Sequence, residues 1–162
     1  MKCPNCGNKQ LKKYVYGYRG MCEDNEVLGG CMISFDSPTY YCEECENSFG
    51  TYSTYYELKE DNELLAVLSK FPRSKGVDIY EGAKIKRTQY NEKLIAKLSK
   101  TQCFIEKDEY LVCKNYISLN TFKEASLLIS GNPEYTKSQW TKIDTVNNFN
   151  YVEQVIKMMC EK

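Results

Sequence analysis

Two cysteine pairs near the start of the chain constrain its fold more than any other feature. Each pair has the spacing Cys-x-x-Cys, and the first follows Met1-Lys2 directly. This spacing places two thiolates on one tight turn, and two such turns supply the four sulfurs of a closed tetrahedral zinc site. The chain contains no histidine, which excludes Cys₂His₂ and Cys₃His sites. The sequence therefore predicts one structural Zn²⁺ per chain, bound by Cys3, Cys6, Cys42 and Cys45.

The two turns differ in local sequence. Pro4 fixes φ inside the first turn, and Gly7 follows its second cysteine, where the chain must bend back sharply. Glu46 occupies the equivalent position in the second turn, where a glycine would be expected. The first turn is therefore the better formed of the two by sequence.

Disulfides or incidental thiols are the alternative to a metal site. Nine cysteines are an odd number for a disulfide framework, and the start of the chain does not resemble a signal peptide, so we expect a cytoplasmic protein. Cys22 and Cys31 lie between the two pairs and are an alternative second set of ligands. Three further cysteines lie among apolar residues and are interpreted as small core residues: Cys103, Cys113 and Cys160.

Charge is distributed unevenly along a chain whose net charge is zero. Residues 1–20 carry five positive charges and no negative one. Residues 21–64 carry one positive and eleven negative charges, a net of −10, and residues 69–100 carry nine and three, a net of +6. This pattern suggests different partners for different parts of the chain. No apolar run reaches the length of a membrane span, so we expect a soluble protein with no membrane partner.

Residues 1–54 are expected to form a small antiparallel zinc ribbon. Residues 11–18 alternate bulky and polar side chains and are predicted to be a strand, residues 32–35 a second, and residues 39–41 lead into Cys42. So small a unit buries too little surface to fold alone, so the metal is expected to supply the missing folding energy.

Residues 55–108 are predicted to form a helical, basic connector. The spacing of leucines predicts a helix over residues 55–71, ended by breakers at residues 71–76. A basic segment with one aromatic follows at residues 84–90, and a short helix is predicted through residues 94–98. The basic segment suits contact with phosphates, and a solvated connector without a ligand is an equally good interpretation.

Residues 109–162 are predicted to form an all-α domain, so the chain as a whole is assigned to the α+β class. A first helix is predicted from about residue 109 to 117. Thr121 and Glu124 fit a capping box at the start of a second helix, which ends at Gly131. A third helix is predicted over residues 134–143 and a fourth over residues 149–160.

Two short helices joined by a glycine-containing turn predict a helix-turn-helix. In that arrangement Trp140 packs into the core, and the polar residues of the third helix face base edges and phosphates. A helical bundle with no nucleic-acid role is the alternative, and the neutral charge of this region favours it. The full set of predicted DNA-contacting residues is Thr121, Lys123, Tyr135, Thr136, Lys137, Gln139 and Lys142.

The combination resembles the MqsA-type antitoxins, which join an N-terminal YgiT-type zinc finger to a C-terminal helix-turn-helix of the Cro/repressor type. The resemblance rests on Met1-Lys2-Cys3-Pro4-x-Cys6, on Tyr41-Cys42-x-x-Cys45-Glu46-x-Ser48, and on the C-terminal segments 118–126 and 138–140. It implies that the four cysteines hold the zinc and that Tyr135 and Gln139 read bases.

The function implied by the resemblance is that of an antitoxin in a type II toxin–antitoxin system. The zinc region would neutralise a toxin, commonly an mRNA-cleaving ribonuclease, and the helix-turn-helix would dimerise and repress its own operon at a palindromic operator. The acidic segment of residues 21–64 is suited to binding a basic toxin. The alternative is a zinc-dependent protein–protein inhibitor or adaptor of mobile-element origin that has lost sequence-specific DNA binding. We find no catalytic constellation in the sequence, so no enzymatic activity is predicted.

Overall fold

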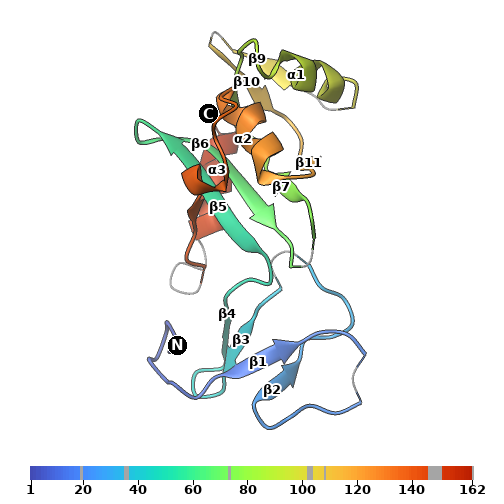
Figure 1. Cartoon of the computed structure of the whole chain (residues 1–162). Coiled ribbons are helices and arrows are strands. Elements are labelled where there is room, and N and C mark those ends of the chain that lie inside the picture. The colour runs from blue at the N-terminus through green and yellow to red at the C-terminus, as the bar shows by residue number, and fades with distance from the viewer. Residues whose placement is uncertain are drawn as a thin grey trace. The chain divides into compact units, whose positions relative to one another are not determined.

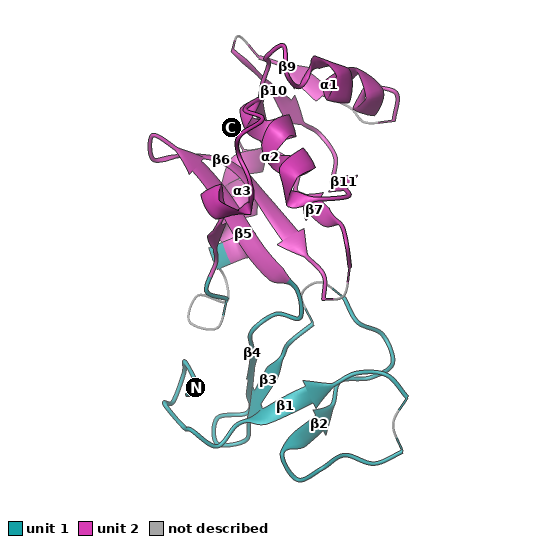
Figure 2. Ribbon diagram, viewed as in Figure 1, with its two compact units in different colours: residues 1–53, 144–151 teal, residues 54–143, 152–162 magenta. Residues whose placement is uncertain are grey.

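The structure is a computed structural model that describes residues 1–18, 20–34, 37–72, 74–101, 104–107, 109–145 and 151–161. The chain forms two compact units (Figure 2): unit 1 comprises residues 1–53 and 144–151, and unit 2 comprises residues 54–143 and 152–162. Over the described residues the secondary structure is mostly β, with twelve strands in three sheets and three short α-helices.

Unit 1 is built on a four-stranded mixed sheet (Figure 1) with the strand order β2-β1-β3-β4. Strand β1 pairs in parallel with β2 and antiparallel with β3, and β3 pairs antiparallel with β4. Its core is small: Phe49 and two cysteines are the buried apolar side chains of one cluster, with Leu11 and Tyr40 packed against them. The strands are β1 (Lys12–Val15), β2 (Glu26–Leu28), β3 (Tyr40–Cys42) and β4 (Asn47–Phe49).

Unit 2 contains a five-stranded sheet with the order β11-β7-β6-β5-β12 and a three-stranded sheet with the order β8-β10-β9. All of its strand pairs are antiparallel. Helix α2 packs on β7, β8 and β11. The elements are β5 (Thr54–Glu60), β6 (Glu63–Lys70), β7 (Val77–Ile79), β8 (Lys84–Lys86), α1 (Glu92–Leu98), β9 (Phe104–Glu106), β10 (Tyr110–Cys113), β11 (Ile117–Leu119), α2 (Phe122–Ser130), the 3₁₀ turn η1 (Lys137–Gln139), β12 (Thr141–Lys142) and α3 (Tyr151–Cys160).

The predicted helix over residues 55–71 is wrong, because this stretch forms the β5–β6 hairpin. Asp61 and Asn62 form its two-residue turn, with φ of 49° and 65°. Positive φ at both turn positions is what a type I′ hairpin requires, and an α-helix cannot contain it. Strand β6 is buried on both faces from Leu65 to Ser69, and such a strand has no alternation that would distinguish it from a buried helix.

The predicted all-α domain and its helix-turn-helix are also wrong. Residues 110–113 and 117–119 are strands, and their burial alternates with the period of two that a half-buried strand shows. The predicted third helix is only the three-residue turn η1, followed by β12, which pairs with β5. Within the described residues 109–145, α2 is therefore not followed by a second α-helix, and the structural reason for expecting a homodimer on paired half-sites is lost.

Several local predictions are confirmed. Helix α2 begins where the cap was predicted, with the Glu124 backbone N–H donating to Thr121 Oγ1 at 3.1 Å, and ends at Gly131 with φ of 66°. The capping box is only half formed, because the Glu124 carboxylate accepts from the Asn120 backbone N–H at 2.8 Å and not from that of Thr121. Trp140 is buried and its Nε1 donates to Ser126 Oγ at 2.8 Å. Helices were also correctly predicted at α1 and α3. The predicted strand over residues 32–35 is not present in its described part, residues 32–34, and Phe35 lies outside the described residues.

Candidate metal centre

The first cysteine turn is closed by backbone hydrogen bonds. The Gly7 N–H donates to the Cys3 carbonyl at 2.9 Å, and the Cys3 N–H donates to the Asn8 carbonyl at 2.7 Å. Gly7 has φ of 77°, and a Cβ built on it would meet nothing within 4 Å. Glycine is therefore favoured at this position by backbone conformation alone and not by crowding.

The second cysteine turn is the β-turn that joins β3 to β4. Cys42 is the last residue of β3, and Asn47 is the first residue of β4. Glu46 has φ of 52°, so it takes the left-handed conformation that Gly7 takes in the first turn. Glu46 therefore follows the same backbone path as the glycine of the first turn. For a residue with a side chain, this left-handed φ costs about 1 kcal/mol.

The four predicted ligands lie together, with all four sulfur atoms within 4.8 Å of one another. The Sγ atoms of Cys3 and Cys45 are 3.6 Å apart, and so are those of Cys6 and Cys42. A tetrahedron with Zn–S bonds of about 2.3 Å has edges of about 3.8 Å, so the cluster has the size that a tetrathiolate site needs. The donor set fits zinc, and a tetrahedral set of four sulfurs also fits iron.

The thiols of this cluster influence one another. Burial raises the pKa of the Cys3 thiol, but hydrogen bonds from the backbone N–H groups of Cys6 and Asn5 outweigh it and lower that pKa to about 7. The backbone N–H of Asn8 lowers the pKa of Cys6, but burial and the three neighbouring sulfurs raise it more strongly, to about 12. One thiolate therefore forms readily, and further thiolates at these distances need a cation to offset their mutual repulsion.

Two polar contacts beside the cluster were missed by the sequence prediction. Asn8 Nδ2 donates to Cys42 Sγ at 3.9 Å, and Lys12 forms an ion pair with Glu43 inside the second turn. An amide that donates to a ligand sulfur stabilises the thiolate and orients it. The spacing of the cysteines does not predict either contact.

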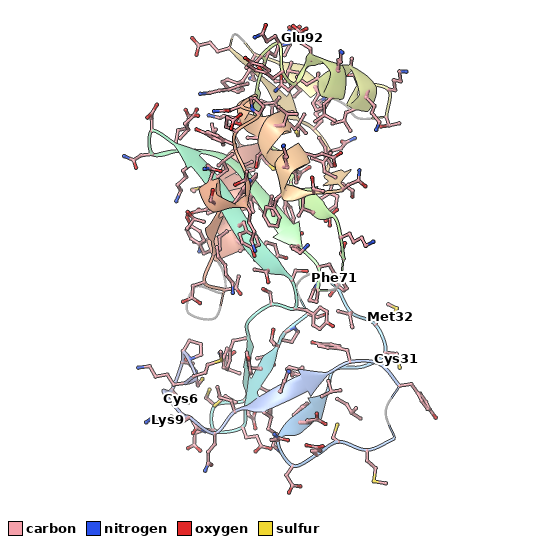
Figure 3. All side chains as sticks on the ribbon, in the orientation of Figure 1. Cys6, Lys9, Cys31, Met32, Phe71 and Glu92 are labelled. Atoms are coloured by element: carbon pink, nitrogen blue, oxygen red, sulfur yellow. The ribbon has the colours of Figure 1, made fainter. Side chains whose placement is uncertain are left out.

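The remaining cysteines fall into separate environments. Cys22 and Cys31 are exposed and do not belong to the four-sulfur cluster, and Figure 3 shows Cys31 well apart from Cys6 within unit 1. Cys113 is buried, as predicted for a core residue, and burial raises its pKa to about 12. Cys160 is exposed, so its assignment to the core is wrong, and Cys103 lies outside the described residues.

The structure places the predicted DNA-contacting residues in several kinds of local structure. Thr121 serves as the cap of α2, Lys123 is exposed in its first turn, and Lys142 is exposed on β12. Thr136 caps η1, and its backbone N–H donates to Gln139 Oε1 at 2.6 Å. The Gln139 side chain is thus engaged in a local cap and is not presented by a recognition helix.

Tyr135 and Lys137 contact side chains of their own unit. The Tyr135 hydroxyl donates to Glu60 Oε1 at 3.2 Å. The Lys137 ammonium lies 5.6 Å from the centre of the Tyr56 ring and 5.5 Å from that of Phe122. Both contacts are explained by packing on β5 and α2 without a nucleic acid.

The basic segment of residues 84–90 is also paired with acidic residues. Lys84 forms an ion pair with Glu63, and Lys86 forms one with Glu60. A third such pair joins Arg87 to Glu106. These carboxylates reduce the positive potential that phosphate binding would need, which weakens the expectation that this segment contacts phosphates.

No protein-family model, curated protein or solved structure matches this chain. The resemblance to MqsA-type antitoxins therefore rests on the quoted sequence motifs alone. Among the described residues, no helix has both the length and the apolar character needed to cross a membrane.

Proposed function

We propose that this protein is a zinc-stabilised adaptor or inhibitor that acts by binding another protein. The observation that carries the proposal is the cluster of four cysteine sulfurs within 4.8 Å of one another in a unit with little other core. Four thiolates fill a tetrahedral coordination sphere, so the ion serves the fold and leaves no position for a reacting water. A unit whose surface is held in place in this way is suited to presenting a binding site.

Zinc is the proposed ion, with one bound per chain by Cys3, Cys6, Cys42 and Cys45. When bound, it neutralises thiolate charge and joins the first turn to the β3–β4 turn. The free thiols at Cys22 and Cys31 suit a reducing compartment, so the cytoplasm is part of the proposal.

Neutralisation of a basic toxin is one form that this role can take. It is the function that the family resemblance implies for the zinc region, and the acidic composition of residues 21–64 supports it. Operator repression is not part of the proposal, because it required the helix-turn-helix that residues 109–145 do not form.

Two measurements on the full chain test the proposal. Metal analysis of the protein purified without chelators should give one zinc per chain, and cobalt substitution should give the spectrum of a tetrathiolate site. A titration against the DNA upstream of the gene should then show binding no tighter than to random DNA of equal length. Lys137→Ala should leave that weak binding unchanged.

Either of two results would overturn the proposal. If the purified protein holds no metal and unit 1 is nevertheless folded, zinc is not needed for the fold and the proposed zinc-dependent function is wrong. Tight, salt-dependent binding to the upstream DNA would show a regulatory role that an adaptor does not have.

A further inference from the structure

Large apolar side chains are exposed in one short stretch of unit 1. The exposed fraction is 88% for Met21, 54% for Leu28 and 87% for Met32, and Tyr18, just before this stretch, is 98% exposed. Figure 3 shows Met32 at the outside of unit 1. Single exposed apolar residues are common, but four within fifteen consecutive positions form a feature that needs an explanation.

The backbone beneath these side chains is held firmly. Tyr16 packs across Gly29, where a Cβ would lie 2.3 Å from the tyrosine ring, and the Tyr16 hydroxyl donates to the Pro38 carbonyl at 2.6 Å. The Gly17 N–H donates to the Gly30 carbonyl at 2.9 Å. These contacts fix the backbone at the ends of the two loops that flank β2. The loops that carry the exposed methionines are therefore anchored where they join the sheet.

Strand β2 lies between these loops and at the edge of its sheet. Among the strands that the structure describes, it pairs only with β1, with Leu28 opposite Val15. The other edge of β2 is thus available to a further strand or an extended segment of another protein. The strand is only three residues long, so such pairing would add to side-chain contacts and would not replace them.

The charged side chains of this edge itself are acidic, and Lys13 on the neighbouring strand β1 lies opposite one of them, Glu26. Residues 20–34 contain three acidic residues and no lysine or arginine. Glu23 and Asp24 are exposed, and Glu26 is half-buried at the start of β2. A second copy of the same edge would bring these carboxylates together, whereas a basic partner would be attracted to them.

We propose that the β2 edge, defined as Tyr18 and residues 20–34, is a docking surface for a basic protein segment with apolar side chains. Lysine or arginine residues of the partner meet the carboxylates, and its apolar side chains cover the two methionines. Methionine side chains adapt to partners of different shape, which suits an apolar docking surface carried by loops. The inference deepens the proposed adaptor function and rests on it.

The methionine methyl groups provide a direct test. The full-length, zinc-loaded chain labelled with ¹³C at its methionine methyls gives five signals, one for each methionine in the sequence. Two synthetic amphipathic peptides serve as probes, one built from leucine and lysine and the other from leucine and glutamate. We expect the leucine–lysine peptide to shift the signals of Met21 and Met32 and to leave those of Met158 and Met159 in place.

Variants then separate this surface from general stickiness. Met21→Ser/Met32→Ser should weaken binding of the leucine–lysine peptide by about tenfold or more. Met158→Ser is the matched control, because Met158 is 54% exposed in unit 2 and lies outside the proposed surface. Raising the salt concentration from about 0.1 M to about 1 M shortens the Debye length from about 10 Å to about 3 Å and should also weaken binding.

Three results would overturn the inference. Equal shifts with the leucine–glutamate peptide would show that charge does not select the partner. Shifts confined to Met158 would place the binding in unit 2. Concentration-dependent shifts of Met21 and Met32 without any peptide would identify the surface as a contact between copies of the chain. Any of these results in a protein that holds one zinc leaves the metal part of the proposed function intact.

Discussion

Removal of the metal should unfold unit 1 and leave unit 2 folded. In unit 1 the buried apolar cluster consists of Phe49, Cys3 and Cys42, so two of its three members are predicted metal ligands. Zinc binding to a site of this kind contributes about 10–16 kcal/mol at neutral pH, whereas the net stability of a small domain is about 5–15 kcal/mol. The first exceeds the second over most of these two ranges, so we expect unit 1 to be unfolded without the metal.

The assay can follow the two units separately. Trp140 is the only tryptophan of the chain and is buried in unit 2, so its fluorescence reports on unit 2. Amide NMR signals from residues 1–53 report on unit 1. After addition of a strong chelator we expect those signals to collapse to random-coil positions while the emission of Trp140 stays unchanged. Lowering the pH should have the same effect, because protons compete with zinc for the thiolates.

Matched cysteine variants provide the control for this prediction. Cys42→Ser should reproduce the effect of the chelator, because it removes one of the four ligands. Cys22→Ser and Cys31→Ser should not, because both side chains are exposed and outside the sulfur cluster. Dispersed amide signals from unit 1 in the chelated protein would refute the reasoning, and so would a red shift of Trp140 emission in parallel with the loss of unit 1.

Further substitutions test individual details of the structure by their effect on thermal unfolding of the zinc-loaded protein. Gly7→Ala should lower the free energy of unfolding by about 1 kcal/mol, and Glu46→Gly should raise it by a similar amount, because both positions have left-handed φ. Effects of the same sign for the two variants would contradict this. Asn62→Val should destabilise the β5–β6 hairpin by about 1–2 kcal/mol at its φ of 65°, and an unchanged midpoint would argue against the turn. Ser126→Ala should cost about 1–3 kcal/mol, because it leaves the buried Trp140 Nε1 without its acceptor; a neutral result would mean that a water replaces the hydroxyl.

The parts of the structure that could be predicted from sequence are those fixed by local chemistry. The cysteine spacing was enough to bring Cys3 and Cys42 to one cluster, although 39 positions of the printed sequence separate them. The cap at Thr121 and the left-handed Gly131 fixed the two ends of α2. In the helix, a few neighbouring residues determine each end. In the cysteine cluster, each turn is local, and the long-range contact between the two turns was predicted because four thiolates suit one tetrahedral metal ion.

The fold of unit 2 could not be predicted because its short apolar segments are compatible with both strands and helices. Apolar residues in the stretch from Leu64 to Leu68 fit a buried strand as well as a helix. The informative residues were Asp61 and Asn62, a pair that tolerates positive φ between two apolar and aromatic runs. With the hairpin recognised, the strands at residues 110–113 and 117–119 would have had a sheet to join, and a helical domain would have been a poorer alternative.

The metal site and the β2 edge are connected through the sheet of unit 1. Cys42 ends β3, β3 pairs with β1, and β1 holds β2 through the pairing of Val15 with Leu28. If zinc maintains this sheet, the shifts of Met21 and Met32 caused by the leucine–lysine peptide should disappear when the metal is removed and return when zinc is added back. Binding that survives chelation would mean that the loops recognise the peptide without the sheet. The zinc would then stabilise the protein without forming its docking surface, and the adaptor proposal would lose its link to the metal.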